Sequence, residues 1–276
     1  MHKKHFFLGD KIAETRDFTP QNQGFGKKTM PSRDRTAHAA FVKERYTAAV
    51  DQAIRLLDER EAEGQPVANG VYVDVEMDKS FVPDQYGKQD GRNGATIMKV
   101  TEKEDGNNVD VTVYVKREKK DWLGKMADEY SAKDTRNGEP ANKNKIVPIN
   151  DVVCTDIRTL YISQAEFDAI PEEGAHTYEL WLSHSKDYGA DEIKDKLGRM
   201  GIVQVAKPLL FEGVDVWLVQ ATKPQLCTLP LSLGYIEGIR PYRQPSILVS
   251  SDMESREWSE LIRGTSFVAM TQSKCK

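Results

Sequence analysis

The sequence lacks long apolar runs and contains few cysteines. No stretch of its 276 residues approaches the roughly 20 apolar residues that a membrane helix needs, and the first eight residues lack the apolar core of a secretory signal. The three cysteines, Cys154, Cys227 and Cys275, are widely separated and odd in number, which argues against a disulfide framework or a Cys-x-x-Cys metal site. We therefore expect a cytoplasmic protein with no membrane partner, no cofactor and no bound metal.

The sequence also lacks a large excess of charge of one sign. Its 39 Lys and Arg residues are nearly balanced by 43 Asp and Glu residues, and the formal net charge is -4. Such a chain produces no field that attracts a polyanion, so we do not expect nucleic acid as a partner. Its length suits about two domains of ordinary size, each able to close a core of its own.

Apolar periodicity predicts an α+β domain over residues 36–170. Residues 1–35 show no such periodicity, and we expect an extended or disordered lead-in there. Apolar residues three and four apart predict a long helix over residues 37–63, and alternating valines predict strands at 71–75 and 109–115. The turn sequence Asp105–Asn108 predicts a hairpin between residues 95–100 and 109–115. Further helices are expected at 119–131 and 153–161.

Residues 171–245 show a second pattern, in the order β-α-β-β-α-β. The expected strands are 177–183, 202–206, 214–221 and 235–241, and the expected helices are 190–200 and 224–231. This is the split βαβ order of a ferredoxin-like domain, in which two helices cover one face of a four-stranded antiparallel sheet. The predicted fold class is therefore α+β with two domains, and residues 246–276 are expected to form a tail or linker.

Motifs for catalysis are incomplete. Gly264-Thr265-Ser266 is similar to the segment that carries the nucleophile of subtilisin-like proteases. A serine nucleophile also needs a base to take its proton and an acid to orient that base, and neither the Asp-Thr-Gly nor the His-Gly segment of such proteases is present. We therefore expect no catalytic residues and no enzymatic activity, and interpret Ser266 as a remnant or a coincidence.

Several segments, in order along the chain, carry a resemblance to a known family. They are Arg33-Asp34-Arg35, Gly70–Val73, Tyr114-Val115, Asn142–Asn144, Tyr178–Leu182, Leu210-Phe211 and Ile239–Pro241. Over roughly residues 31–262 the chain resembles the amino-terminal, propeptide-like and non-catalytic region of bacterial intracellular subtilisin-like serine proteases. That family is often encoded beside an AAA ATPase, and its catalytic domain would begin shortly after a segment like Glu257–Ile262. We expect this chain to lack that domain.

The resemblance implies a non-enzymatic regulatory module of a subtilisin-like protease, acting as an inhibitor, a folding chaperone or a targeting domain. It also implies a place in intracellular peptidase biology, and in anti-phage defence together with the ATPase. An alternative from a different class is a protein-interaction scaffold for an AAA ATPase or another defence component. RNA binding is disfavoured, because the strands of the second domain lack the aromatic and basic residues that such a sheet needs.

One predicted binding surface lies on the second domain. The residues expected to point inward are Tyr178, Leu180, Leu182, Val216 and Leu218. Period-2 alternation then places Trp181, Trp217 and Val219 together on the opposite, uncovered face. Either residues 36–165 or a protease partner would cover the two tryptophans.

The second predicted surface is the segment that follows the last strand. Pro241 and Pro245 favour an extended chain there. An extended segment can pair with a substrate groove, so we expect Tyr242, Ile247 and Val249 to fill pockets of a protease. The alternative is that this segment is only a linker.

Overall fold

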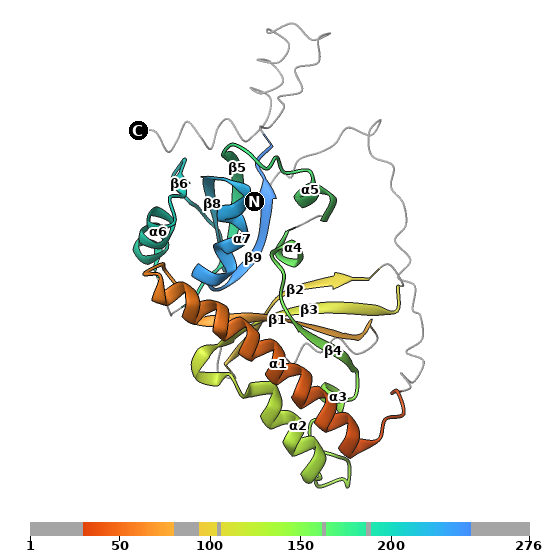
Figure 1. Cartoon of the computed structure of the whole chain (residues 1–276). Coiled ribbons are helices and arrows are strands. Elements are labelled where there is room, and N and C mark those ends of the chain that lie inside the picture. The colour runs from red at the N-terminus through yellow and green to blue at the C-terminus, as the bar shows by residue number, and fades with distance from the viewer. Residues whose placement is uncertain (1–29, 80–93, 104–105, 162–163, 186–188, 244–276) are drawn as a thin grey trace, which may run out of the picture. The chain divides into compact units, whose positions relative to one another are not determined.

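The computed structural model describes residues 30–79, 94–103, 106–161, 164–185 and 189–243. Within these residues the chain is α+β, with helices packed on two antiparallel sheets (Figure 1). The predicted tail at 246–276, including Ser266, and all of the predicted lead-in up to residue 29 lie outside the described residues.

The first sheet has the strand order β2-β3-β1-β4, and all neighbours are antiparallel. Its strands are β1 (Gly70–Asp78), β2 (Ala95–Glu102), β3 (Asn108–Lys116) and β4 (Ile149–Cys154). Two helices, α1 (Arg35–Ala62) and α2 (Trp122–Ala132), lie side by side on this sheet (Figure 1). Alternating valines of β1 and β3 are fully buried against them, as the period-2 pattern predicts. Shorter elements are η2 (Arg117–Lys119), α3 (Lys143–Ile146), α4 (Ile157–Leu160) and α5 (Gln164–Asp168).

The helix predicted over residues 153–161 is wrong in its first part. Cys154 ends strand β4, which pairs with β1 through Val73–Cys154 and Val75–Val152, and only Ile157–Leu160 is helical. β1 is buried along this edge, and its backbone N–H and C=O groups need partners there. The spacing of apolar residues within 153–161 does not indicate that β1, which lies far away in the sequence, needs a strand partner there.

The second sheet has the strand order β6-β8-β5-β9, and β7 also pairs with β8. Its strands are β5 (His176–Ser183), β6 (Val203–Gln204), β7 (Leu209–Leu210), β8 (Val214–Ala221) and β9 (Ile236–Pro241), and all pairs are antiparallel. Its helices are α6 (Ala190–Arg199) and α7 (Lys223–Ser232). Thr222 and Gln225 form a reciprocal capping box at the start of α7. The predicted order of strands and helices agrees with the structure, except that β6 is shorter and β7 was not expected.

Buried contacts between residues far apart in sequence join the two sheets. The hydroxyl of Tyr72 in β1 donates to the carbonyl oxygen of Leu233 (3.0 Å) and accepts from the backbone N–H of Ile236 (2.9 Å). Beside it, the ring centroid of Tyr114 lies 4.9 Å from that of Tyr72 and 4.6 Å from that of Tyr235. A tyrosine of the first sheet therefore supplies two hydrogen bonds at the start of β9.

Two cationic side chains of α6 bind the segment that follows α1. Lys196 Nζ donates to the carbonyl oxygen of Val67 (3.0 Å), and Arg199 Nη2 donates to that of Gly64 (2.9 Å). The described residues from Met30 to Tyr242 cluster as one compact unit. The predicted division near residue 171 stays a prediction.

Candidate functional site

One face of the second sheet forms a core with helices α6 and α7. Residues that oppose each other in an antiparallel pair point to the same face. Leu180 opposes Trp217, and Tyr178 opposes Val219. All four side chains belong to one buried cluster with apolar residues of α6 and α7.

The face predicted for Trp217 and Val219 is therefore wrong. Trp217 is 2% exposed and Val219 is 0% exposed, so both are core residues and do not share a face with Trp181. Strand β8 carries apolar side chains at both odd and even positions, and its sequence does not show which set is buried. The pairing with β5 decides this, because it aligns Trp217 with Leu180.

Trp181 lies on the other face of the sheet and is half-buried. Its indole Nε1 donates to Glu179 Oε2 (3.2 Å), and the guanidinium carbon of Arg240 lies 4.3 Å from its ring centroid. Glu179 and Arg240 are cross-strand partners on β5 and β9. A cation over an aromatic ring that solvent can still reach contributes about 0.5–1 kcal/mol. The two charged side chains thus hold Trp181 in place without enclosing it.

Exposed apolar residues gather at one edge of this sheet. Of the nine large hydrophobic residues exposed in the described part of the chain, five lie within residues 203–211: Val203, Val205, Leu209, Leu210 and Phe211. We call these five residues the edge patch. Val203 and Leu209 oppose residues of β8 on the face that carries Trp181, whereas Leu210 points to the other face. Scattered apolar side chains are normal on a protein surface, but a local concentration of them marks a candidate interaction site.

Sequence reasoning missed the edge patch. The signal in the sequence is the run Leu209-Leu210-Phe211 between Pro208 and Glu212, part of which belongs to the family resemblance. Three consecutive apolar residues beside a proline are compatible with a buried strand as well as with an exposed one. Their exposure became visible only once β7 was placed at the edge of the sheet.

The predicted binding residues after β9 are only partly described. Tyr242 is 40% exposed, and its backbone N–H donates to the carbonyl oxygen of Thr177 (3.0 Å). The chain therefore continues to pair with β5 just beyond the last residue of β9. Ile247 and Val249 lie outside the described residues.

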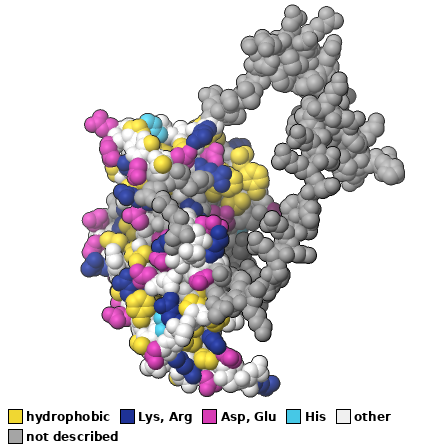
Figure 2. Space-filling model, turned by 90° about the vertical axis from the view of Figure 1, so that its right-hand side faces the viewer, with side chains coloured by type: hydrophobic (Ala, Val, Ile, Leu, Met, Phe, Trp, Pro, Cys, Tyr) yellow, Lys and Arg dark blue, Asp and Glu magenta, His cyan; other side chains and the backbone are white. Residues whose placement is uncertain are grey.

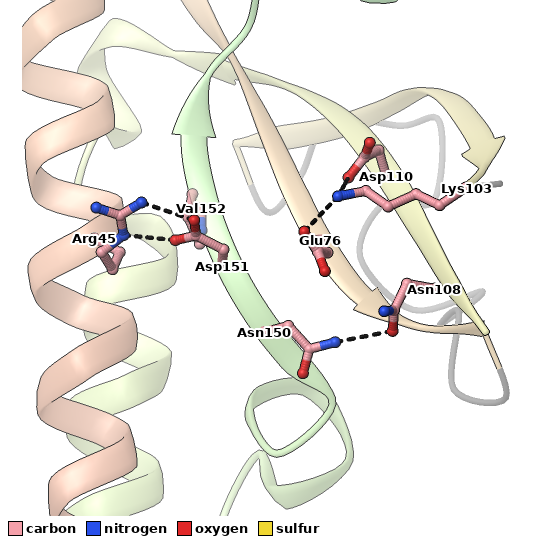
Figure 3. A network of polar contacts seen from close by, with 8 residues as sticks. All are labelled: Arg45, Glu76, Lys103, Asn108, Asp110, Asn150, Asp151 and Val152. Atoms are coloured by element: carbon pink, nitrogen blue, oxygen red, sulfur yellow. Dashed lines mark hydrogen bonds and ion pairs between the residues drawn. The ribbon is translucent and has the colours of Figure 1, made fainter. Parts of the chain in front are cut away.

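Charged groups of the first sheet are paired with one another (Figure 3). Lys103 Nζ contacts Glu76 and lies 3.4 Å from Asp110 Oδ1. Burial opposes the charge on Lys103, but the hydrogen bond to Glu76 raises its pKa. Arg45 of α1 donates two hydrogen bonds to Asp151 of β4 (2.5 and 2.7 Å), which lowers the pKa of that carboxyl. These pairs tie the strands to each other and to α1, which is a structural role.

Asp74 is an exception among the acids, because it is buried inside the first sheet. It is 6% exposed, and Thr112 Oγ1 donates to its Oδ1 (2.6 Å). Burial raises the pKa of Asp74, and the hydrogen bond from Thr112 opposes that shift. Nearby, Lys99 Nζ donates to the carbonyl oxygens of Thr159 and Tyr161 (2.6 Å each), and burial lowers its pKa. Both groups make the stability of the fold depend on pH.

Neither metal-binding nor membrane-spanning features stand out in the described residues. No three His, Cys, Asp or Glu side chains there come close enough together to hold a metal ion. None of the described helices is both long and apolar enough to cross a membrane. On the face drawn in Figure 2, charges of both signs are interspersed with hydrophobic side chains.

Comparison with known proteins finds no family model that matches the chain and no similar curated protein. The candidate site therefore rests on its own geometry. It consists of the sheet face that carries Trp181, which α6 and α7 leave uncovered, and of the edge patch beside it.

Proposed function

We propose that this chain is a non-catalytic regulatory module that binds an intracellular subtilisin-like serine protease through the open face of its second sheet. The observation that carries the proposal is the asymmetry of that sheet. One face is buried under α6 and α7, whereas the other leaves Trp181 half-buried beside the exposed edge patch. An exposed apolar surface of this kind favours protein binding over small-molecule chemistry.

The topology of the second sheet supports the same proposal. The strand order β6-β8-β5-β9, with antiparallel neighbours and two intervening helices, agrees with a split βαβ, ferredoxin-like domain. The family resemblance implies such a domain for a protease propeptide. The module would then act as an inhibitor, a folding chaperone or a targeting domain of the protease, including in anti-phage defence.

The segment after β9 offers a second contact. Tyr242 leaves the sheet in an extended pairing and is partly exposed. A chain that continues from there into a substrate groove gains main-chain hydrogen bonds, and side chains such as Tyr242, Ile247 and Val249 could fill pockets of the protease. Truncation after Pro241 tests this contact. It should weaken inhibition of the protease more than the binding of the module, and unchanged inhibition would make the segment a linker.

Binding to the cognate protease, measured by calorimetry and by inhibition of peptide hydrolysis, tests the docking face. Trp181→Ala should weaken binding by at least about tenfold, because buried aromatic residues dominate protein interfaces. Leu209→Ser changes an exposed side chain and should weaken binding without affecting the fold. Phe41→Ala is the matched control, since Phe41 is an exposed aromatic residue on α1.

Two outcomes would count against the proposal. One is the absence of binding to any cognate subtilisin-like protease. The other is an equal effect of the Trp181→Ala and Phe41→Ala substitutions. Capture of an AAA ATPase in place of a protease would favour the scaffold function.

A further inference from the structure

β7 is an edge strand, and backbone N–H and C=O groups lie on its outer side. It pairs with β8 through Leu209–Val216 and Leu210–Asp215, and the backbone N–H of Phe211 donates to the carbonyl oxygen of Val214 (3.0 Å). Successive residues of a strand direct their backbone groups to opposite sides. The N–H and C=O of Leu210 therefore point away from β8, where the described part of the chain provides no further strand.

The side chains of this edge are also unprotected. Leu209, Leu210 and Phe211 are 62%, 74% and 52% exposed. Natural edge strands are usually guarded by their short length, or by a charge or a proline within the strand, because they otherwise pair with another chain. β7 is short, but it contains neither a charge nor a proline; the nearest, Pro208 and Glu212, lie outside the strand.

We propose that β7 pairs in antiparallel fashion with β7 of a second copy of this chain, about a two-fold axis at Leu210. Because the outward backbone groups belong to Leu210, its N–H and C=O bond reciprocally to those of Leu210 in the second copy. Leu209 of each copy then opposes Phe211 of the other copy. Two apolar pairs therefore form on the open face of the joined sheet.

The paired stretch is short, because Glu212 and Gly213 form the turn that joins β7 to β8. The residues that oppose one another are therefore Leu209, Leu210 and Phe211, and none of them is charged.

The apolar area at the seam fits a weak dimer. Leu209, Leu210 and Phe211, at on the order of 100 Å² each, give roughly 300 Å² for each copy, or about 600 Å² in total. That sum lies below the roughly 1,000 Å² of a specific interface. We therefore expect weak association, with a dissociation constant on the order of 100 µM. Dimer formation would cover Leu209 and Phe211, so the dimer and the proposed protease complex would be alternative states.

Cysteine cross-linking tests the register directly. In a chain whose three native cysteines are replaced by alanine, Leu210→Cys should form a disulfide-linked dimer on mild oxidation. The Cα atoms of a hydrogen-bonded antiparallel pair are about 5.5 Å apart, inside the range of disulfides. Glu212→Cys is the matched control: Glu212 is also exposed, but it lies two residues from the two-fold axis, in the turn after β7, so the two cysteines are too far apart to bridge.

Sedimentation equilibrium of the purified chain, from about 1 to about 200 µM, measures the association itself. The chain should dimerise over this range, and Leu210→Lys should weaken the dimer at least about tenfold by placing a charge on the edge. A monomer at every concentration, a dimer unaffected by Leu210→Lys, or equal cross-linking of the two cysteine variants would overturn the proposal. No protease is present, so failure here is distinct from failure of the proposed function.

Discussion

Replacing Tyr72 by phenylalanine tests whether the two sheets fold as one unit. The hydroxyl of Tyr72 donates to the carbonyl oxygen of Leu233 and accepts from the N–H of Ile236. Both of these residues are fully buried. The substitution removes only that oxygen and leaves the two backbone groups without this partner. A buried polar group that loses its hydrogen bond costs about 1–3 kcal/mol, so Tyr72→Phe should lower the free energy of unfolding by roughly 2–5 kcal/mol.

Tyr161 offers a matched control within the same buried cluster. It is 1% exposed, and its hydroxyl has no hydrogen-bond partner among the described residues. Removing a buried hydroxyl that has no partner is neutral or stabilising. Tyr161→Phe should therefore change the free energy of unfolding by less than about 0.5 kcal/mol, or raise it.

Urea unfolding, followed by tryptophan fluorescence and far-UV circular dichroism on the same samples, measures both effects. Trp122 belongs to the first sheet and its helices, whereas Trp217 belongs to the core of the second sheet. If the junction makes one cooperative unit, the two signals should give one transition that shifts as a whole in Tyr72→Phe. The reasoning is refuted if Tyr72→Phe costs no more than Tyr161→Phe, or if two transitions appear and only one of them moves.

Three further predictions concern single positions. Gly234→Ala should destabilise the fold by about 1–3 kcal/mol, because a Cβ at residue 234 would lie 2.5 Å from the hydroxyl oxygen of buried Tyr114; an unchanged melting temperature would contradict this. Gly198→Ala in α6 meets no atom within 4 Å and should instead stabilise the fold by about 0.5–1 kcal/mol, measured in the same way. Burial raises the pKa of Asp74, so the folded chain keeps this proton to a higher pH than the unfolded chain, and stability falls as the pH rises above about 4 towards the folded pKa. Asp74→Asn keeps an oxygen that accepts from Thr112 and should remove that part of the pH dependence; identical profiles of urea midpoint against pH would show the idea to be wrong.

Local sequence patterns were sufficient wherever one element decides its own structure. The alternating valines of β1 and β3 predict strands, because a strand with one buried face needs an apolar residue at every second position. The cap at Thr222 is likewise decided locally, because a cap depends only on the adjacent turn of α7. These patterns also predict the α+β class and the order of elements in the second sheet.

The candidate site was predictable only in part. Trp181 was placed on the open face and lies there, because its strand alternates clearly between apolar and polar residues. The edge patch was not predicted, since the exposure of Leu209, Leu210 and Phe211 depends on β7 lying at the edge of a sheet. No pattern within three residues distinguishes an exposed edge strand from a buried one.

Tertiary contacts alone decided which side of β8 is buried and how the two sheets meet. Both alternating sets of β8 are apolar, so Trp217 is assigned to the core by its pairing with Leu180, and not by its own neighbours in the sequence. The hydroxyl of Tyr72 reaches Leu233 across 161 positions, and nothing near either residue in the sequence indicates the other. Periodicity tells which side chains share a face, but the partner of that face is chosen by the packing of the whole chain.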